Sequence, residues 1–417
     1  MDSLGPLWLL VAILAATVVV AIVAGRSAVP ASVGLVLIGL VVSIVGPAVS
    51  LPIPPELLLA IVLPGLVFEA AFRTDLAILR PAAGSVLVLA IPGVVIVAAI
   101  VALVLTVTTT VSPTEGFLVG AMVAATDPAA VLSTFRRVAV PPRLATVVEM
   151  ESLVNDGTGI VLFALALELL AGGGSLGGSL IGFVVKVVGG AAIGLVAGGL
   201  AARVVRRVDD HLTELTITVV LAYGTYLAAE AIGLSGVIAT LLAAGTLGAL
   251  ARDGLSARAV EAIDVVWEFA AFLLTAGVFL LVGVSIAPEA LVAAAGAIGW
   301  GIVAILLARA VVVYGLIGGG SAILGRLTTR AAGRDAGSAG WTEGDPPVGG
   351  LPRAWLHVVF WAGLRGAVSV ALALSLPPDL PNRDLLQGLT FGIVLFTLIV
   401  QGSTAGWVVR RSGSGAT

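Results

Sequence analysis

Long apolar runs, separated by Pro, Gly or charged residues, follow one another along almost the whole chain. About 20 consecutive apolar residues are enough for a helix to cross the hydrocarbon core of a bilayer. The runs are continuous and do not alternate with polar residues, which favours membrane helices over a transmembrane β-barrel. The pattern predicts thirteen spans, at residues 6–25, 28–49, 56–72, 82–108, 115–134, 143–170, 178–205, 212–231, 234–250, 258–285, 289–325, 354–376 and 385–409.

Composition supports an all-α polytopic membrane protein. Of the 417 residues 59% are hydrophobic and only 11% are charged, whereas soluble domains are about 25% charged. The absence of Cys excludes disulfides and Cys-ligated metals. A net charge of −3 offers no general basic surface for nucleic acid. No cofactor, soluble partner or soluble enzymatic activity is expected.

The distribution of basic residues predicts the orientation. With the N-terminus outside, Lys186, Arg309 and Arg365 fall inside spans and Arg383 falls in an outer loop. All the other Lys and Arg residues then lie in loops on the cytoplasmic side, as the positive-inside rule requires. This predicts a multi-pass protein of a prokaryotic cell (inner) membrane, with a cytoplasmic C-terminus and a flexible cytoplasmic loop at about 327–353.

An acid sits beside a proline in the middle of the fifth span. Pro128 lacks an amide hydrogen and pushes Asp127 out of helical geometry, so a helix break is expected there. Unwound backbone beside a midplane carboxylate is how broken transporter helices bind alkali cations. The alternative is a structural kink in which Asp127 only caps the second half-helix.

The sixth span carries a polar stripe. Asp156 lies thirteen residues into this span, about 19 Å along the helix and near the midplane. Helical spacing places Ser152 on the same stripe, with Glu151 and Asn155 on the adjacent one. Hard cations prefer such oxygen ligands, whereas the alternative is a hydrogen-bond network that only packs helices.

Ionisable residues at this depth cost about 2.5–3.5 kcal/mol each on insertion scales, so they usually have partners or functions. Arg309 and Arg365 are the basic residues available to neutralise the buried acids. Glu69 is a further candidate, although it could simply pair with Arg73 one turn later.

Four segments together resemble the cation/proton antiporter superfamily, in the NhaP-type branch that includes animal sodium/proton exchangers. Residues 126–131 (Thr-Asp-Pro-Ala-Ala-Val) are similar to its ATDPxAV segment, and residues 151–156 (Glu-Ser-Leu-Val-Asn-Asp) to its ESLxND segment. Residues 308–310 and 363–368 resemble its two arginine motifs. Met150 departs from the pattern, since animal members commonly have Gly there.

The resemblance implies two inverted six-helix repeats in which the fifth and twelfth spans cross as broken helices. It also implies a moving core at about 82–170 and 289–409. The scaffold would comprise about 6–72 and 178–285 and would form a homodimer in contact with membrane lipid.

The resemblance also implies roles for single residues. Asp156, Asp127, Ser152 and the Thr126 carbonyl would bind the monovalent cation, the first of these in competition with a proton. The supporting roles would be a hydrogen bond from Asn155 to the broken helix, an ion pair of Glu151 with Arg309, and neutralisation of the crossing by Arg365.

The implied activity is electroneutral exchange of one cation, Na⁺ foremost, for one proton. A K⁺/H⁺ antiporter and a sodium-coupled organic-anion symporter of the same fold remain alternatives. A membrane-embedded enzyme is disfavoured, because HExxH, GxGD and DDxxD motifs are absent.

Overall fold

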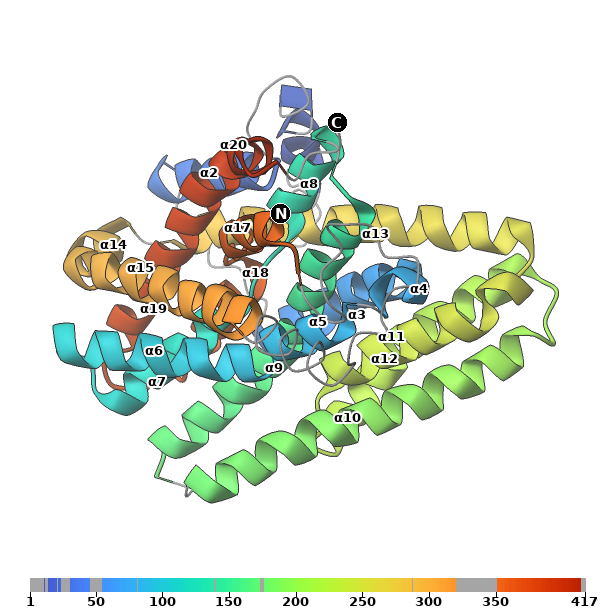
Figure 1. The fold of residues 1–417 in the computed structure, drawn as a ribbon, viewed down its shortest axis with the longest axis horizontal. Coiled ribbons are helices and arrows are strands. Elements are labelled where there is room, and N and C mark those ends of the chain that lie inside the picture. The colour runs from blue at the N-terminus through green and yellow to red at the C-terminus, as the bar shows by residue number, and fades with distance from the viewer. Residues whose placement is uncertain are drawn as a thin grey trace, which may run out of the picture.

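A computed structural model describes residues 11, 14–20, 22–23, 31–45, 55–80, 82–138, 140–172, 176–286, 288–319 and 351–413. Every regular element within these ranges is a helix, as Figure 1 shows, which confirms the all-α prediction. The predicted first span, 6–25, falls only partly within the described residues. The predicted loop at 327–353 falls outside them, apart from its last three positions.

The helices follow the predicted apolar runs closely. Those of the first half are α2 (Ala31–Val45), α3 (Pro55–Arg73), α4 (Leu76–Leu79), α5 (Ala83–Ala90), α6 (Pro92–Thr108), α7 (Pro113–Ala124), α8 (Ala129–Arg137) and α9 (Pro142–Leu170). Those of the second half are α10 (Leu176–Val205), α11 (His211–Ala231), α12 (Gly236–Ala251), the 3₁₀ turn η2 (Arg252–Gly254), α13 (Ala257–Ser285), α14 (Pro288–Ala293), α15 (Ala295–Ala310), the π-helix η3 (Val311–Gly319), α17 (Arg353–Trp361), α18 (Ala367–Leu374), α19 (Arg383–Phe396), the π-helix η4 (Thr397–Gly402) and α20 (Ser403–Arg411).

Several predicted spans consist of more than one helix. The span predicted at 82–108 divides at Ile91, because Pro92 starts α6 and cannot continue the hydrogen bonding of α5. Among the described residues, seven helices are long and apolar enough to cross a membrane by length and composition. Breaks, short helices and the partly described first span all lower this number, and the number thirteen stays a prediction.

The helices pack in two groups (Figure 1). The first group joins α10, α11, α12 and α3, with α13 lying along α2. The second joins α6, α7, α15 and α19, and α18 packs on α7 and α19. Helix α9 contacts α7 of the second group and the adjoining α5, as well as α10 and α12 of the first group. Its polar stripe therefore lies where the groups meet.

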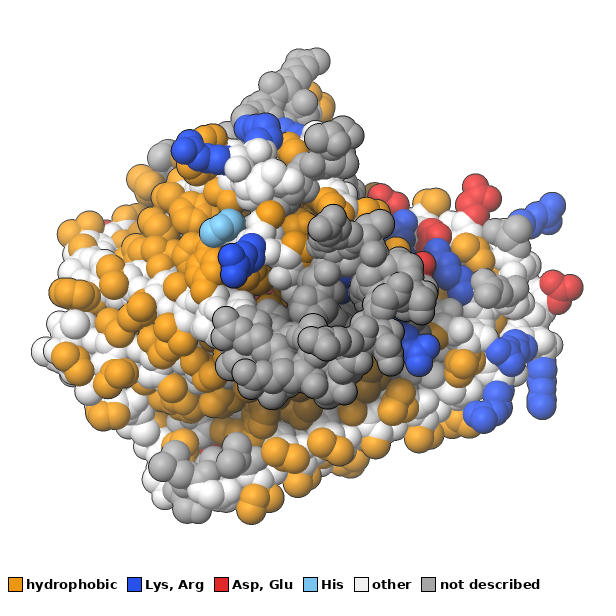
Figure 2. All heavy atoms as spheres, in the orientation of Figure 1, with side chains coloured by type: hydrophobic (Ala, Val, Ile, Leu, Met, Phe, Trp, Pro, Cys, Tyr) orange, Lys and Arg blue, Asp and Glu red, His pale blue; other side chains and the backbone are white. Residues whose placement is uncertain are grey.

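The surface has the character expected in a bilayer. Figure 2 shows many apolar side chains across the visible face, most of the charged side chains toward its right-hand end, and a few basic ones near the top and centre. Large apolar side chains such as Val188 and Val196 on α10 are more than half exposed. Arg203, Arg206 and Arg207, near the end of the same helix, are also exposed. Exposed valine along the helix and arginine at its end are typical of a membrane span.

Glycines allow α10 to approach the backbone of α12. Gly190, Gly194 and Gly198 recur at every fourth position and so share one face of the helix. A Cβ atom added at Gly198 would come within 2.5 Å of the Ala243 carbonyl oxygen, and one at Gly194 would collide with the carbonyl of Ala239. Small residues at a regular spacing are how membrane helices gain close packing.

We predict that Gly194→Ala lowers the unfolding temperature in detergent, whereas the matched change Gly199→Ala raises it or leaves it unchanged. Both substitutions improve helix propensity by about 1 kcal/mol. A Cβ at Gly199 meets only the flexible end of Arg203, at 3.7 Å, whereas Gly194 faces backbone. Overpacking of this kind costs about 1–3 kcal/mol. Equal unfolding temperatures for the two variants would contradict the close approach.

Candidate functional site

Two helices break at the centre of the molecule. Between α7 and α8, Ala125 is extended (φ −59°, ψ 137°), and helical structure resumes after Pro128. Between α17 and α18 the helix ends at Trp361, and Gly366 is neither helical nor extended (φ −147°, ψ −133°). The first break is where the Asp-Pro pair predicts it, because proline cannot supply the amide for the preceding turn.

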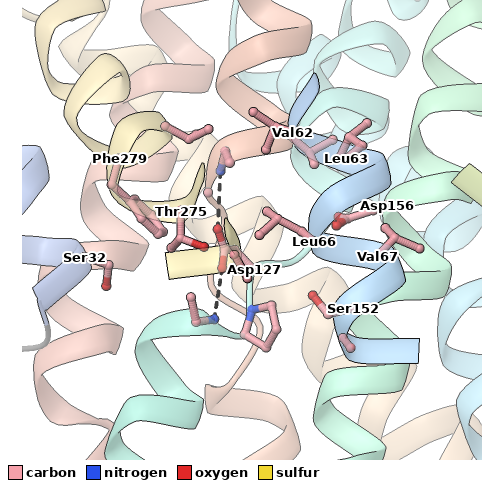
Figure 3. Close-up of a pocket in the computed structure, with 18 of the residues that line it drawn as sticks. Ser32, Val62, Leu63, Leu66, Val67, Asp127, Ser152, Asp156, Thr275 and Phe279 are labelled. Carbon is pink, nitrogen blue, oxygen red and sulfur yellow. Dashed lines mark hydrogen bonds between the residues drawn. The ribbon is translucent and has the colours of Figure 1, made fainter. Parts of the chain in front are cut away.

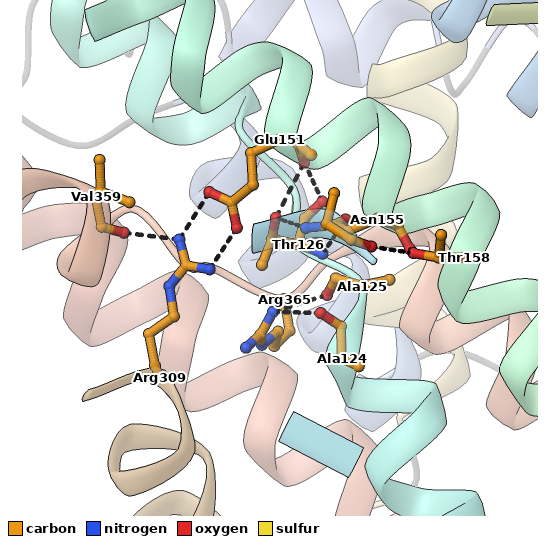
Figure 4. Close-up of polar contacts among 11 residues, drawn as sticks. Ala124, Ala125, Thr126, Glu151, Asn155, Thr158, Arg309, Val359 and Arg365 are labelled. Carbon is orange, nitrogen blue, oxygen red and sulfur yellow. Dashed lines mark hydrogen bonds and ion pairs between the residues drawn. The ribbon is translucent and has the colours of Figure 1, made fainter. Parts of the chain in front are cut away.

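The two breaks lie against each other. The Asp127 amide donates a hydrogen bond to the Leu364 carbonyl at 2.8 Å. The Arg365 guanidinium donates to the carbonyls of Ala124 (2.8 Å) and Ala125 (3.1 Å), which end α7 (Figure 4). Helix ends leave such carbonyls without intrahelical partners. Arg365 therefore supplies the missing donors, and a cation at a helix C-terminus is also favoured by the helix dipole.

Asp127 does the complementary task for the helix N-termini. Its Oδ1 accepts from the Ala129 amide (2.9 Å) at the start of α8, and its Oδ2 from the Ala367 amide (3.4 Å) at the start of α18. A Cβ on Gly366 would lie 2.5 Å from the Asp127 Cβ, so only glycine fits here. The capping role considered from the sequence is present, and one carboxylate serves two half-helices.

Helix α9 is tied to the first break by three polar side chains. The Asn155 amide accepts from the Thr126 backbone N–H (3.0 Å) through Oδ1 and donates to the Thr126 hydroxyl (2.6 Å) through Nδ2 (Figure 4). The Ser152 hydroxyl donates to the Thr126 carbonyl. These groups are buried, so every bond replaces a contact with water. The structure thus brings together the Asn155, Ser152 and Thr126 groups that the motifs single out.

Asp156 lines a cavity of about 360 Å³ together with Thr126, Asp127 and Ser152. Figure 3 shows Asp127, Ser152 and Asp156 around this space, with Leu66 and Phe279 among its apolar walls. Oδ1 of Asp156 is buried and has no hydrogen-bond partner in the described part of the chain. Of the two aspartates that line this cavity, Asp156 is therefore the one that does not cap a half-helix.

Glu151 and Arg309 form a buried ion pair beside the crossing. The Arg309 guanidinium contacts both carboxylate oxygens of Glu151, with Nη2 to Oε2 at 2.9 Å, and also donates to the Val359 carbonyl at 2.8 Å. The side chains are only 1% (Glu151) and 5% (Arg309) exposed. The pair joins α9, α15 and α17, which are far apart in sequence (Figure 4).

Glu69 also lines the cavity, from α3, and its Oε1 lies 2.6 Å from Nη1 of Arg73. The pair with Arg73 that the sequence allowed is present. A part for Glu69 in transport stays a prediction. Sequence reasoning missed Glu268 of α13, which lines the same cavity and also contacts Arg73. An acid eleven residues inside the predicted span 258–285 is the signal that could have found it. Thr397, whose hydroxyl accepts from the Arg365 amide at 3.0 Å, carries no comparable signal.

We predict that Glu151→Gln and Arg309→Ala each lower the unfolding temperature strongly, while the double variant recovers part of the loss. Removing one partner leaves a buried charge uncompensated, which costs about 3–5 kcal/mol. A double-mutant cycle on the purified protein, followed by thermal unfolding, measures the coupling. Additive losses would show that the two side chains act independently.

The chain is similar to known proteins over most of its length. Residues 11–411 match the family described as "sodium/hydrogen exchanger, transmembrane". The Na⁺/H⁺ antiporter NhaS2 of Synechocystis is 35% identical over 404 residues, covering 97% of this chain and 70% of that protein. The Na⁺/H⁺ antiporter NhaP of Pseudomonas aeruginosa is 33% identical over 375 residues, covering 86% of this chain and 82% of that protein.

The fold also matches a solved structure. The sodium proton antiporter MjNhaP1 from Methanocaldococcus jannaschii superposes with a TM-score of 0.74 at 21% identity, over 97% of this chain and 100% of that one. At this identity the likeness shows the antiporter fold, as the motifs predicted. The matched family consists of membrane transporters and not of enzymes. With these matches and the paired helix breaks, the chain belongs to the sodium/hydrogen exchanger family.

Proposed function

We propose that this chain exchanges a monovalent cation, foremost Na⁺, for a proton across the cell membrane, one for one and without net charge movement. The observation that carries the proposal is Asp156, a cavity carboxylate with a buried oxygen that the described residues leave unbonded. The naming of the relatives as Na⁺/H⁺ antiporters supports the same activity.

The cation ligands in this proposal are Asp156, Asp127, Ser152 and the Thr126 carbonyl, which lie around one cavity. All four supply oxygen, the ligand type that hard cations prefer. The fixed caps on Asp127 limit its freedom, since both of its oxygens already accept backbone amides. Asp156 therefore carries the exchange, and it holds either the cation or a proton.

Electroneutral exchange follows from competition at a single carboxylate. With a cation or a proton bound, Asp156 carries little net charge and can move relative to the membrane. Empty, it carries a full charge that is costly to expose to hydrocarbon. The loaded forms therefore cross and the empty form does not, which couples the two fluxes without any further energy source.

The moving part in this proposal is the core at about 82–170 and 289–409, against a dimerising scaffold at about 6–72 and 178–285. Two separate packing groups and the position of α9 between them support this division. The exposed Arg203, Arg206 and Arg207 support a cytoplasmic side at the end of α10, and hence an outer N-terminus and a cytoplasmic C-terminus.

We predict that Asp156→Asn abolishes exchange in liposomes while the protein stays folded and monodisperse. Asn is nearly isosteric, yet it can neither take up a proton nor neutralise a cation. Asp127→Asn should reduce exchange less completely, because an amide oxygen can still accept one of the two capping bonds. The matched control Asp379→Asn makes the same chemical change at an exposed turn and should exchange normally. Wild-type exchange by Asp156→Asn would refute the proposal.

We predict a bell-shaped pH dependence whose acid limb moves with cation concentration. Below the pKa of the site, the apparent KM for the cation should rise about tenfold for each unit by which the pH falls, because the concentration of the competing proton rises tenfold. The maximal rate at saturating cation should change much less there, and at high pH the protonated return step should become limiting.

The measurement is isotopic cation exchange in liposomes with equal pH on both sides, repeated with Na⁺, K⁺ and Li⁺. An acid limb that stays fixed while the cation concentration rises a hundredfold would contradict competition at one carboxylate. If K⁺ exchanges faster than Na⁺, the proposed mechanism still holds, but the transported cation is K⁺.

A further inference from the structure

Charged side chains surround one part of the cavity that holds Asp127 and Asp156. Arg73, the last residue of α3, is shared among three acids: its Nη1 lies 2.6 Å from Oε1 of Glu69, its Nη2 lies 3.1 Å from Oε2 of Glu268, and its Nε lies 3.7 Å from Oδ1 of Asp264. Glu69 and Glu268 are themselves cavity-lining residues. A guanidinium is thus held by two of the carboxylates that a cation inside the cavity would meet.

A second arginine keeps Asp264 in place. Nη2 of Arg252 lies 3.0 and 3.3 Å from the two carboxylate oxygens of Asp264, and Nη1 donates to the Phe72 carbonyl at 3.2 Å. The Arg252 guanidinium also lies 5.3 Å from the centre of the Phe72 ring. Asp264 therefore has its own fixed partner, and the variable contacts of Arg73 are those to Glu69 and Glu268.

The contacts of Arg73 are weak enough to exchange. Its side chain is 34% exposed, that of Glu268 is 56% exposed and that of Glu69 is 17% exposed, in contrast to the 5% and 1% of the Arg309–Glu151 pair. Exposed ion pairs contribute little net free energy, because water and dissolved ions screen them. A dissolved cation can therefore replace the guanidinium at Glu69 while Arg73 remains on Glu268.

We infer that Arg73 is a positioning residue beside the cavity, a resident guanidinium that competes with the transported cation for Glu69. Glu268 is its alternative anchor and draws it away from Glu69. Because arginine does not lose its proton in proteins, this competition sets cation affinity without adding a second proton-binding group. The inference rests on the proposed exchange function, since it concerns the affinity for the transported cation.

The inference predicts opposite changes of apparent KM for two neutral substitutions. Arg73→Gln should lower the apparent KM for Na⁺ about two- to fivefold, the range that an exposed ion pair supports. Glu268→Gln should raise it by a similar factor, because Arg73 then stays on Glu69. Arg73→Lys, which keeps the charge, should stay near wild type, and the maximal rates should change little. A purely structural role would instead lower the maximal rate and the unfolding temperature.

The double variant separates shared competition from two independent surface charges. If Glu268 acts through Arg73, Glu268→Gln should have no effect on KM in the Arg73→Gln background. Additive effects would overturn the inference. Glu261→Gln is the matched control for Glu268→Gln and should leave KM unchanged. Glu261 is an exposed acid that also lies on α13 but does not line the cavity.

The experiment is isotopic Na⁺ exchange by the full chain in liposomes, with ionic strength held constant by choline. Absence of exchange in the wild-type protein would refute the proposed function itself. Normal wild-type exchange with an unchanged KM in Arg73→Gln would overturn only the role of Arg73. If Arg73→Gln does not fold, Glu268→Gln decides alone, and an unchanged KM in that variant overturns the inference.

Discussion

Backbone amides and carbonyls inside a bilayer have no water to bond with, so they must find hydrogen-bond partners within the protein. The structure at the centre of the molecule depends on this constraint. Two helices break there, and each break leaves amides and carbonyls without partners within its own helix. The breaks satisfy each other: Arg365 donates to the end of α7, Asp127 accepts from the starts of α8 and α18, and the Asp127 amide bonds to the Leu364 carbonyl. An unpaired Arg365 or Asp127 would be costly in the membrane, but here both side chains complete the hydrogen bonding of the two helix breaks.

The same constraint gives different tasks to the two aspartates that line the cavity, Asp127 and Asp156. Asp127 holds the ends of two half-helices, so its oxygens are committed to the architecture. Asp156 comes from α9, an unbroken helix whose backbone needs no cap at that depth, and Asn155 and Ser152 hold the adjacent turns against Thr126. A rigid frame around one uncommitted carboxylate suits a group whose occupant must change in every transport cycle.

Two ion-pair clusters show how burial changes the role of the same chemistry. Glu151 and Arg309 are buried away from water, and removing either side chain would leave an unpaired buried charge. The pair therefore fixes α9 against α15 and α17. Arg73, Glu69 and Glu268 use similar groups at similar distances, but in contact with water, where exchange of partners is cheap. The first cluster positions the site, whereas the second can respond to dissolved cations.

The sequence by itself determined the membrane class, the break before Pro128 and the polar stripe of α9, because each depends on local geometry or on composition. It allowed the Glu69–Arg73 pair without deciding it. Four motifs identified the family. The resemblance implied the Glu151–Arg309 pair, and the tertiary structure shows it. Only the tertiary structure decided that Arg365 bonds to backbone carbonyls and that Glu268 shares the cavity with Asp156. Glu151 and Arg309 are 158 residues apart, and helical periodicity places a side chain on its own helix without saying which distant helix that face will meet.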